Sequence, residues 1–233
     1  EQTLLVIEAT SNQVNQFGGY TGMLPSQFRT FVAGLADDPL FSQDKLVLGG
    51  DHLGPNPWKS EQADQAMDKA RTLVRQYALA GFTKLHLDAS MLLGGDKAVR
   101  GGILSPEIVA ERSAILCQAA EEGYKQRLEA DSNAVAPVYV IGTEVPVPGG
   151  TEHDEIIKVT TVEDLRETIE LSKHAFLSCG LSSAWQRVVA VVIQPGVEFS
   201  DSTVHEYERE KAQSITQALC DYDTLIFEGH STD

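Results

Sequence analysis

The sequence predicts an α/β fold, a TIM (β/α)8 barrel that is incomplete in this chain because only six parallel strands can be found. Short apolar runs alternate with amphipathic helical stretches, and polar residues follow the predicted strands. No GxGxxG or GxxxxGK[ST] motif follows any of these strands. Six strands joined by single helices require a parallel sheet, either a closed barrel or an open doubly wound sheet. Barrels carry their chemistry at the carboxyl ends of the strands, whereas nucleotide-binding open sheets carry glycine motifs there. These observations favour the barrel.

The predicted strands are continuous apolar runs, as expected for strands that are covered on both faces. They span residues 4–9, 45–49, 84–88, 137–142, 188–193 and 224–227. A polar side chain lies at or just after the end of each: Glu8, Asp51, Asp88, Glu144, Gln194 and Glu228. These side chains are therefore the candidates for a site at one rim of the barrel.

The segments between the strands have apolar residues at helical spacing. The predicted helices span residues 25–36, 60–80, 105–122, 161–178 and 203–220. Ser60, Ser105 and Thr161 are suited to be N-caps, and Gly81 is suited to end the second helix. Thr161 also begins a pattern that resembles a capping box, with Asp164 in the usual Glu position.

The composition fits one large domain. With 233 residues, 42% hydrophobic, the chain can bury a substantial core. We expect residues 1–233 to form a single TIM-barrel domain that is truncated at both ends. Its 34 acidic and 18 basic residues give a formal charge of −16, which argues against non-specific binding to nucleic acid or an anionic membrane.

Nothing in the sequence suggests export. No apolar run of about 18 residues and no signal-peptide pattern is present, so we expect a cytoplasmic protein without a membrane span. The cysteines have no CxxC spacing and are predicted to be buried free thiols: Cys117, Cys179 and Cys220.

The segment GGDHLGPN, residues 49–56, most strongly suggests chemistry. Asp51 and His52 at a strand terminus can supply a general base beside a metal ligand. The flanking glycines allow the backbone to approach a ligand closely. The alternative is a structural turn in which Asp51 caps backbone amides.

The next strand, in KLHLDAS, places Asp88 at its end and His86 two residues earlier on the same side. A lone histidine in the middle of a strand is more often a hydrogen-bonded core residue than a ligand. We therefore predict a structural role for His86 and a catalytic one for Asp88, because a carboxylate at the barrel mouth needs a partner there.

Later strand ends add further donors. Glu144 precedes a stiff Pro/Gly loop, and Gln194 offers an amide where many metal barrels have a histidine. His52, Glu228 and His230 are the predicted ligands of a divalent metal, zinc or another, with Glu144 beside them. No short-range ligand spacing supports this set.

The loop of residues 8–23 is dense in amides, hydroxyls and glycines. Such side chains suit the recognition of sugar hydroxyls, so the amides of this loop are predicted to bind substrate. The alternative is a polar loop that seals the barrel mouth. The amides concerned are Asn12, Gln13, Asn15 and Gln16.

Six segments carry a resemblance to a known family: IEATSNQVNQFGGYTGM, GGDHLGPNPW, KLHLDAS, YVIGTEVPVPGG, AWQRVVAVVIQPGVEF and FEGHSTD. They closely resemble the accessory, non-catalytic subunit of class II D-tagatose-1,6-bisphosphate aldolase, whose members are also labelled tagatose-6-phosphate kinases. The resemblance implies a TIM barrel of galactitol- or amino-sugar-type carbohydrate catabolism. It also implies a sugar phosphate as ligand and the catalytic aldolase subunit as partner, whose activity and stability the barrel supports. A homo-oligomer is a further expectation.

The sequence is also similar to the catalytic class II aldolases. The similarity implies that Asp51 corresponds to their catalytic acid/base and His52 to a zinc ligand, and that Glu144 belongs with the catalytic residues. Their later Asp-Ala/Gly-Ser motif corresponds to residues 88–90, and we assign Ser90 to substrate binding.

Two further zinc histidines of those enzymes correspond to Gln194 and Glu228, with His230 two residues beyond. An amide is a poor zinc donor, which agrees with a non-catalytic subunit. Gln194 is therefore assigned to substrate binding.

Two other functions remain open. A metal-dependent ketose or uronate epimerase, or an aldolase-like enzyme, would use five of these residues: Asp51, His52, Glu144, Glu228 and His230. A tagatose-6-phosphate kinase is less well supported, because no motif in the sequence cradles a triphosphate.

Overall fold

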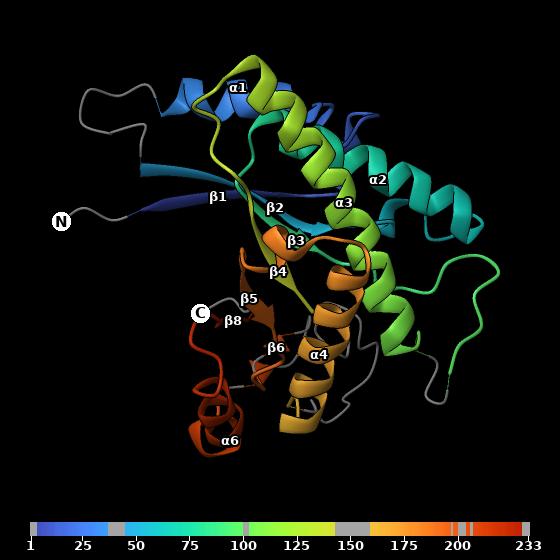
Figure 1. Ribbon diagram of the computed structural model, residues 1–233, viewed down its shortest axis with the longest axis vertical. Coiled ribbons are helices and arrows are strands. Elements are labelled where there is room, and N and C mark those ends of the chain that lie inside the picture. Colours follow the sequence, from blue (N-terminus) through green and yellow to red (C-terminus); the bar gives the residue numbers. More distant parts are fainter. Residues whose placement is uncertain are drawn as a thin grey trace.

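The computed structural model describes residues 4–36, 45–99, 103–142, 159–196, 198–199, 204–205 and 207–229. In this part of the chain one six-stranded parallel sheet has the order β1-β2-β3-β4-β5-β8. The sheet curls into half a barrel, with helices along its outer side (Figure 1). The predicted incomplete TIM barrel is confirmed. The strands are β1 (Leu5–Thr10), β2 (Leu46–Leu53), β3 (Lys84–Leu87), β4 (Val138–Ile141), β5 (Val188–Val192) and β8 (Ile226–Glu228).

The helices lie between successive strands, as the alternation predicts. They are α1 (Pro25–Leu35), α2 (Ala63–Ala80), α3 (Pro106–Ala130), α4 (Val162–Ser178) and α6 (Arg209–Leu219), with a short α5 (Ser182–Trp185) before β5. Two 3-10 turns, η1 (Gly19–Thr21) and η3 (Asn56–Trp58), follow β1 and β2. An antiparallel pair consists of β6 (Glu198–Phe199) and β7 (Val204–His205). β7 lies within the predicted helix 203–220, and α6 begins later, at Arg209.

Three of the four predicted helix ends are confirmed. Ser105 accepts a hydrogen bond from the backbone of Ile108, Thr161 and Asp164 form a capping box, and Gly81 ends α2 with φ 89°. The Ser60 cap is wrong, since α2 begins three residues later.

The late start of α2 has a local cause. Glu61 and Ala63 exchange backbone hydrogen bonds with Gly94, at 2.7 and 3.0 Å. The chain before α2 is therefore extended beside the loop that follows β3, and Gln62 becomes the N-cap. This contact brings two loops at the barrel mouth together.

α3 extends eight residues beyond its predicted end at residue 122, because Gly123 does not interrupt the helix. A Cβ on Gly123 would overlap the carbonyl oxygen of Arg75 in α2 and lie 3.1 Å from its carbonyl carbon. The glycine therefore permits close packing of two helices. From the sequence, Gly123 resembles a residue that ends a helix. Its packing partner, Arg75, lies far away in the chain, so the sequence does not reveal the contact.

The core fills the space between the sheet and the helices, with Phe82, Leu85 and Phe176 among its fully buried side chains. Each such side chain contributes roughly 1.5–3 kcal/mol through burial. Tyr77 of α2 is also buried, and its hydroxyl donates to the carbonyl oxygen of Val14 at 2.9 Å. Burial raises the pKa of Tyr77, so it remains a donor and fixes the loop after β1 to α2.

The cysteine prediction is correct for one residue and wrong for two. Cys117 is a buried free thiol inside α3, and burial raises its pKa. Cys179 and Cys220 are exposed, because each lies just beyond a helix end rather than on a packed helix face.

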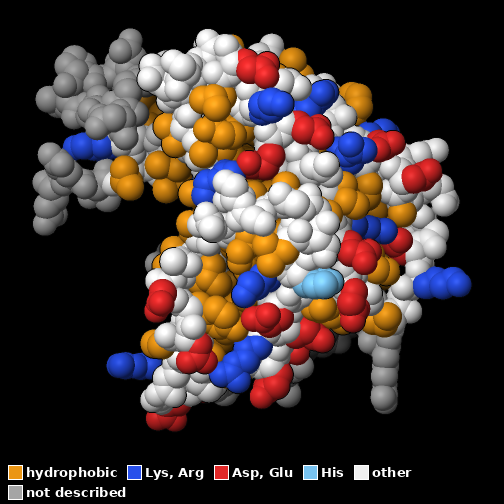
Figure 2. All heavy atoms as spheres, in the orientation of Figure 1, with side chains coloured by type: hydrophobic (Ala, Val, Ile, Leu, Met, Phe, Trp, Pro, Cys, Tyr) orange, Lys and Arg blue, Asp and Glu red, His pale blue; other side chains and the backbone are white. Residues whose placement is uncertain are grey.

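The space-filling view is hollowed on the left, between the parts that hold β1 and β8 in Figure 1 (Figure 2). These strands are the two edges of the sheet, and Leu5, Val6 and Ile226 on them are exposed. The exposed edges agree with a barrel that is open in the described part of the chain. Among the described helices, none is long and apolar enough to cross a membrane.

An ion pair at the amino-terminal ends of the strands joins β4 and β5 to α3. Arg187 contacts Glu121 at 2.6 Å and donates to the carbonyl oxygen of Pro137, while Tyr139 donates to the same carboxylate. The Arg187 guanidinium also lies 5.5 Å from the centre of the Tyr139 ring. This network holds the amino-terminal ends of two strands against a helix.

We expect Arg187→Met to lower the free energy of unfolding by about 2 kcal/mol, because it leaves the half-buried Glu121 without its cation. Urea denaturation measures this loss. Arg166→Met is the matched control: its pair with Asp221 is 55% and 60% exposed, so a change below about 0.5 kcal/mol is expected. Equal losses in the two variants would contradict the structural role of Arg187.

Candidate functional site

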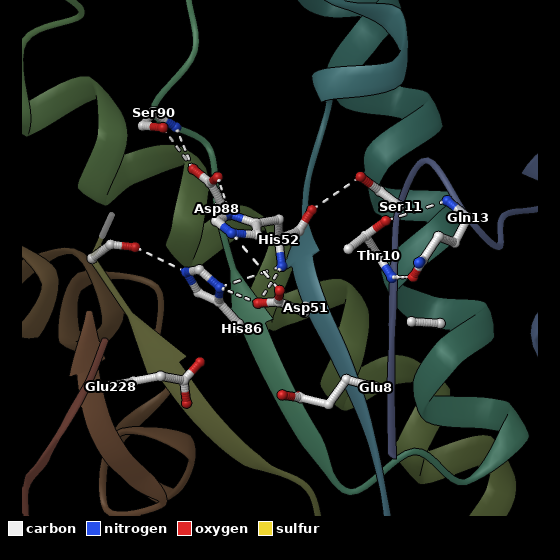
Figure 3. A network of polar contacts seen from close by, with 12 residues as sticks. Glu8, Thr10, Ser11, Gln13, Asp51, His52, His86, Asp88, Ser90 and Glu228 are labelled. Carbon is white, nitrogen blue, oxygen red and sulfur yellow. Dashed lines mark hydrogen bonds and ion pairs between the residues drawn. The ribbon is translucent and has the colours of Figure 1, made fainter. Parts of the chain in front are cut away.

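The strand-end residues of β2 and β3 form one polar cluster inside the barrel. Asp51 and His52 come from β2, His86 from β3, and Asp88 from the first position after β3 (Figure 3). β2 is longer than predicted, so Asp51 and His52 lie within the strand and not beyond it. Asp88 and His86 are buried, whereas Asp51 and His52 are partly exposed.

A bulge in β2 lets two consecutive residues face the same cluster. Successive side chains of a regular strand point to opposite faces of the sheet. The pairing of β2 with β3 shifts between Gly50 and Leu53, and His52 has a φ of 45°. No other non-glycine residue that the structure describes has a positive φ. Such backbone conformations cost about 1–3 kcal/mol and are concentrated at functional sites.

Ser11, in the loop after β1, holds the bulge in place. Its buried hydroxyl donates to the carbonyl oxygen of His52 at 3.0 Å. The polar loop therefore contributes to the site through the backbone of β2.

Asp88 orients His52. Its Oδ2 lies 2.9 Å from His52 Nδ1, while its Oδ1 accepts hydrogen bonds from the backbone and the hydroxyl of Ser90, at 3.0 and 2.7 Å. Burial alone would raise the pKa of Asp88, but the hydrogen bonds from His52 and Ser90 and the nearby His86 lower it below its ordinary value. Asp88 is thus an ionised carboxylate that fixes an imidazole.

His86 is fully buried and contacts the cluster through both ring nitrogens. Nδ1 lies 2.9 Å from Asp51 Oδ1, and Nε2 lies 3.0 Å from the carbonyl oxygen of Gly142. Burial alone would lower the pKa of His86, but the hydrogen bond to Asp51 and the charges of Asp88 and Asp51 raise it. The residue is hydrogen-bonded in the core as predicted, and it also belongs to the site.

The predicted metal set differs from the group that the structure brings together. Among the described residues, one group of side chains has metal-ligand spacing: Asp51, His52 and His86, whose donor atoms lie within 4.8 Å of one another. Two imidazoles and a carboxylate suit zinc and similar divalent metals. Of the predicted set, His52 belongs to this group, and Glu144 and His230 lie outside the described residues.

Glu228 lies below this group and is ion-paired. Lys84 Nζ is 2.8 Å from Glu228 Oε2 and 2.8 Å from Glu8 Oε1, so one ammonium group joins the two edge strands (Figure 3 shows both carboxylates). Burial alone would lower the pKa of Lys84, but hydrogen bonds with Glu228 and Glu8 raise it. A Cβ on Gly49 would overlap Glu8 Oε1, so the glycine leaves the space in which Glu8 crosses β2.

Comparison with known proteins assigns the family. Residues 1–233 match the family described as D-tagatose-1,6-bisphosphate aldolase subunit GatZ/KbaZ-like. The chain belongs to this aldolase-subunit family.

A solved structure supports both fold and family. The crystal structure of a probable tagatose 6 phosphate kinase from Sinorhizobium meliloti 1021 is 43% identical, with a TM-score of 0.84. The match covers 100% of this chain and 53% of that one, so the chain spans about half the length of that relative. The apo homocysteine methyltransferase MmuM from Escherichia coli is 13% identical over 79% of this chain and 57% of its own, with a TM-score of 0.40, too distant to carry an argument.

In this member of the aldolase-subunit family, the loop amides make local contacts. Asn15 is buried and accepts from the backbone of Phe17 and Gly19, Gln13 accepts from the backbone of Thr10, and Asn12 is exposed. These contacts agree with a loop that shapes the barrel mouth, and sugar binding by the loop stays a prediction.

Gln16 and Gln194 differ in their surroundings. The amide nitrogen of Gln16 donates to the carbonyl oxygen of Lys69 in α2, and its buried oxygen has no hydrogen-bond partner among the residues that the structure describes. Gln194 is fully buried two residues after β5, and its oxygen accepts from the backbone of Gly196 at 2.8 Å. Gln194 therefore lies where a turn follows the strand, and its predicted contact with substrate is untested.

Proposed function

We propose that the chain is part of an accessory subunit of class II D-tagatose-1,6-bisphosphate aldolase, active in the cytoplasm in galactitol- or amino-sugar-type catabolism. The observation that carries this proposal is the ion pair of Glu228 with Lys84. The resemblance to catalytic class II aldolases implies that Glu228 and Gln194 correspond to zinc histidines of those enzymes. A carboxylate held by an ammonium group and a neutral amide would both be weak replacements. The family match over the whole chain supports the same function.

In this proposal the barrel mouth binds a sugar phosphate and the subunit binds a catalytic aldolase chain. Asp51 and Asp88 are carboxylates at the mouth that can accept hydrogen bonds from sugar hydroxyls or hold a proton near a carbinol carbon. Ser90, Gln194 and the loop amides supply further polar contacts.

Reconstitution with a catalytic class II aldolase subunit tests the proposal. We expect the two proteins to co-purify, and the catalytic subunit to cleave tagatose 1,6-bisphosphate faster and to unfold at a higher temperature than when alone. Absence of both association and stimulation would contradict an accessory role. The catalytic subunit mixed with an unrelated barrel protein of similar charge is the control.

A metal-dependent epimerase or aldolase-like activity is the second candidate, because Asp51, His52 and His86 form a donor group at the barrel mouth. A divalent metal there would polarise a carbonyl or hydroxyl oxygen of a sugar. Asp51 or Asp88 would then transfer a proton at the adjacent carbon.

A screen of ketose phosphates with the purified protein and no partner separates the two candidates, since turnover without a partner supports the enzyme. ATP and tagatose 6-phosphate belong in the same screen, because the similar solved protein is described as a kinase.

A further inference from the structure

We infer that Asp51, His52 and His86 hold a divalent transition-metal ion, and that Asp88 and the Gly142 carbonyl orient the two imidazoles. This inference needs neither turnover nor a partner, so it stands apart from the accessory role, and the metal-dependent second candidate depends on it. It also replaces the sequence-based ligand set, in which His86 was structural and Glu228 a ligand.

The hydrogen bonds decide which nitrogen of each ring faces the site. His52 Nδ1 is directed at Asp88, so Nε2 is the nitrogen that lies toward Asp51, 3.7 Å from Oδ2. A carbonyl oxygen only accepts, so His86 Nε2 carries a proton for Gly142 and Nδ1 faces Asp51 Oδ1 at 2.9 Å. Each ring thus directs one nitrogen to a different oxygen of the same carboxylate.

These two contacts leave room for a positive charge between the rings and Asp51. An imidazole lone pair and a carboxylate oxygen are both acceptors, so they approach each other across a shared donor, a proton or a metal ion. The backbone N–H of His52 donates to Asp51 Oδ1 at 3.0 Å and to His86 Nδ1 at 3.3 Å, and a cation would add to this contact. The ligand atoms of a tetrahedral zinc site lie roughly 3.3 Å apart. The observed separations of 2.9 and 3.7 Å lie on either side of that value, so a small shift of the rings would admit an ion.

The outer contacts have the form that metal sites use. A ligating histidine usually donates its other N–H to a carboxylate or a backbone carbonyl, which fixes the ring. Asp88 supplies the carboxylate for His52 and is itself held by Ser90, while Gly142 supplies the carbonyl for His86. Both kinds of outer contact are therefore present around a single donor group.

The charge around the group also favours a cation. Asp51, Asp88, Glu8 and Glu228 are four carboxylates, and Lys84 is the one ammonium group that pairs among them in the described chain (Figure 3). With neutral imidazoles the cluster has three negative charges. A divalent ion would neutralise most of this charge.

The donor set indicates the class of metal. Two imidazoles and one carboxylate suit zinc, manganese, iron or cobalt, whereas magnesium and calcium prefer oxygen ligands alone. Asp51 and His52 are partly exposed, so the ion would face the barrel mouth on one side. That side leaves a coordination position for water or for an oxygen of a sugar.

Metal titration of the purified protein tests the inference. After removal of bound metal with a chelator, Co²⁺ is added and followed by its visible absorption, by calorimetry and by elemental analysis. We expect one ion per chain with a tetrahedral or five-coordinate spectrum. His86→Gln and Asp51→Asn each remove a ligand and should weaken binding at least about 100-fold, and Asp88→Asn should weaken it about 10–100-fold.

His174→Gln and Asp68→Asn are matched controls on exposed helix faces and should bind as the wild type does. Circular dichroism shows which variants fold, and Asp51→Asn, at a partly exposed position, decides the question if His86→Gln does not. Absence of stoichiometric Co²⁺ in the wild type would overturn the inference. Unchanged affinity in folded Asp51→Asn, or an equal loss in Glu228→Gln, would overturn the ligand set.

Discussion

Gly54→Ala is expected to destabilise the protein by about 3 kcal/mol or more, a large effect for one added carbon. The new Cβ would overlap the carbonyl oxygen of Asp88 and lie 2.8 Å from its carbonyl carbon. The obstacle is backbone, so no side-chain rotation can relieve it. The displacement would also move the Asp88 carboxylate that holds His52. Urea denaturation followed by circular dichroism measures the loss.

Gly34→Ala is the matched control for this prediction. Gly34 lies in α1, and a Cβ there would meet no atom within 4 Å. Alanine in an exposed helix is favoured over glycine, so a gain of about 0.5–1 kcal/mol is expected. If Gly54→Ala were as stable as the wild type, β2 and the segment after β3 would not lie as close as described.

Lys84→Met is expected to lower the free energy of unfolding by roughly 2 kcal/mol. It removes the cation between Glu8 and Glu228, and these carboxylates would then repel each other across the barrel interior. Removal of one partner from a fully buried pair costs about 3–5 kcal/mol. The expected loss is smaller, because the side chains of Glu8 and Glu228 are 31% and 18% exposed.

Two variants sharpen the test of Lys84. Lys69→Met removes a more exposed pair with Glu61 and should cost less than about 1 kcal/mol. The double variant Lys84→Met, Glu8→Gln should recover part of the loss, since it removes one of the two negative charges. Chemical denaturation of all four proteins at low salt gives the comparison. A Lys84→Met loss no greater than that of Lys69→Met would show that the carboxylates need no counter-charge.

The fold could be predicted because the six sheet strands are short apolar runs and the longer helices have apolar residues at helical spacing, both of which can be recognised within a short stretch of sequence. β2 was predicted too short for a physical reason. Gly49 and Gly50 are weak strand formers, and Asp51 and His52 look like a loop. The strand continues because those glycines leave space for Glu8 of β1, Tyr77 of α2 and Leu53 at the end of β2 itself.

Asp51 and His52 could be recognised from the sequence as the centre of the candidate site, but His86 could not be recognised as part of it. Asp51 and His52 are adjacent in sequence and follow an apolar run. The role of His86 depends on the bulge in β2 and on a carbonyl oxygen of Gly142, which no local pattern reveals. The spacing of His86 and Asp88 was the available signal, because it places both side chains on the same side of β3.

Glu228 was predicted to be a metal ligand, whereas the structure pairs it with Lys84. A carboxylate at a strand end suggests a ligand, and its partner, Lys84, lies 144 residues earlier at the start of another strand. Only the curl of the sheet brings the two together.

Anomalous diffraction from crystals grown with Zn²⁺, measured at the zinc absorption edge, tests most directly whether β2 and β3 build a metal centre. We predict a peak about 2.0–2.2 Å from a carboxylate oxygen of Asp51, from His52 Nε2 and from His86 Nδ1. A peak that is coordinated by His52 and Glu228 instead, with His86 still hydrogen-bonded to Asp51, would contradict this arrangement.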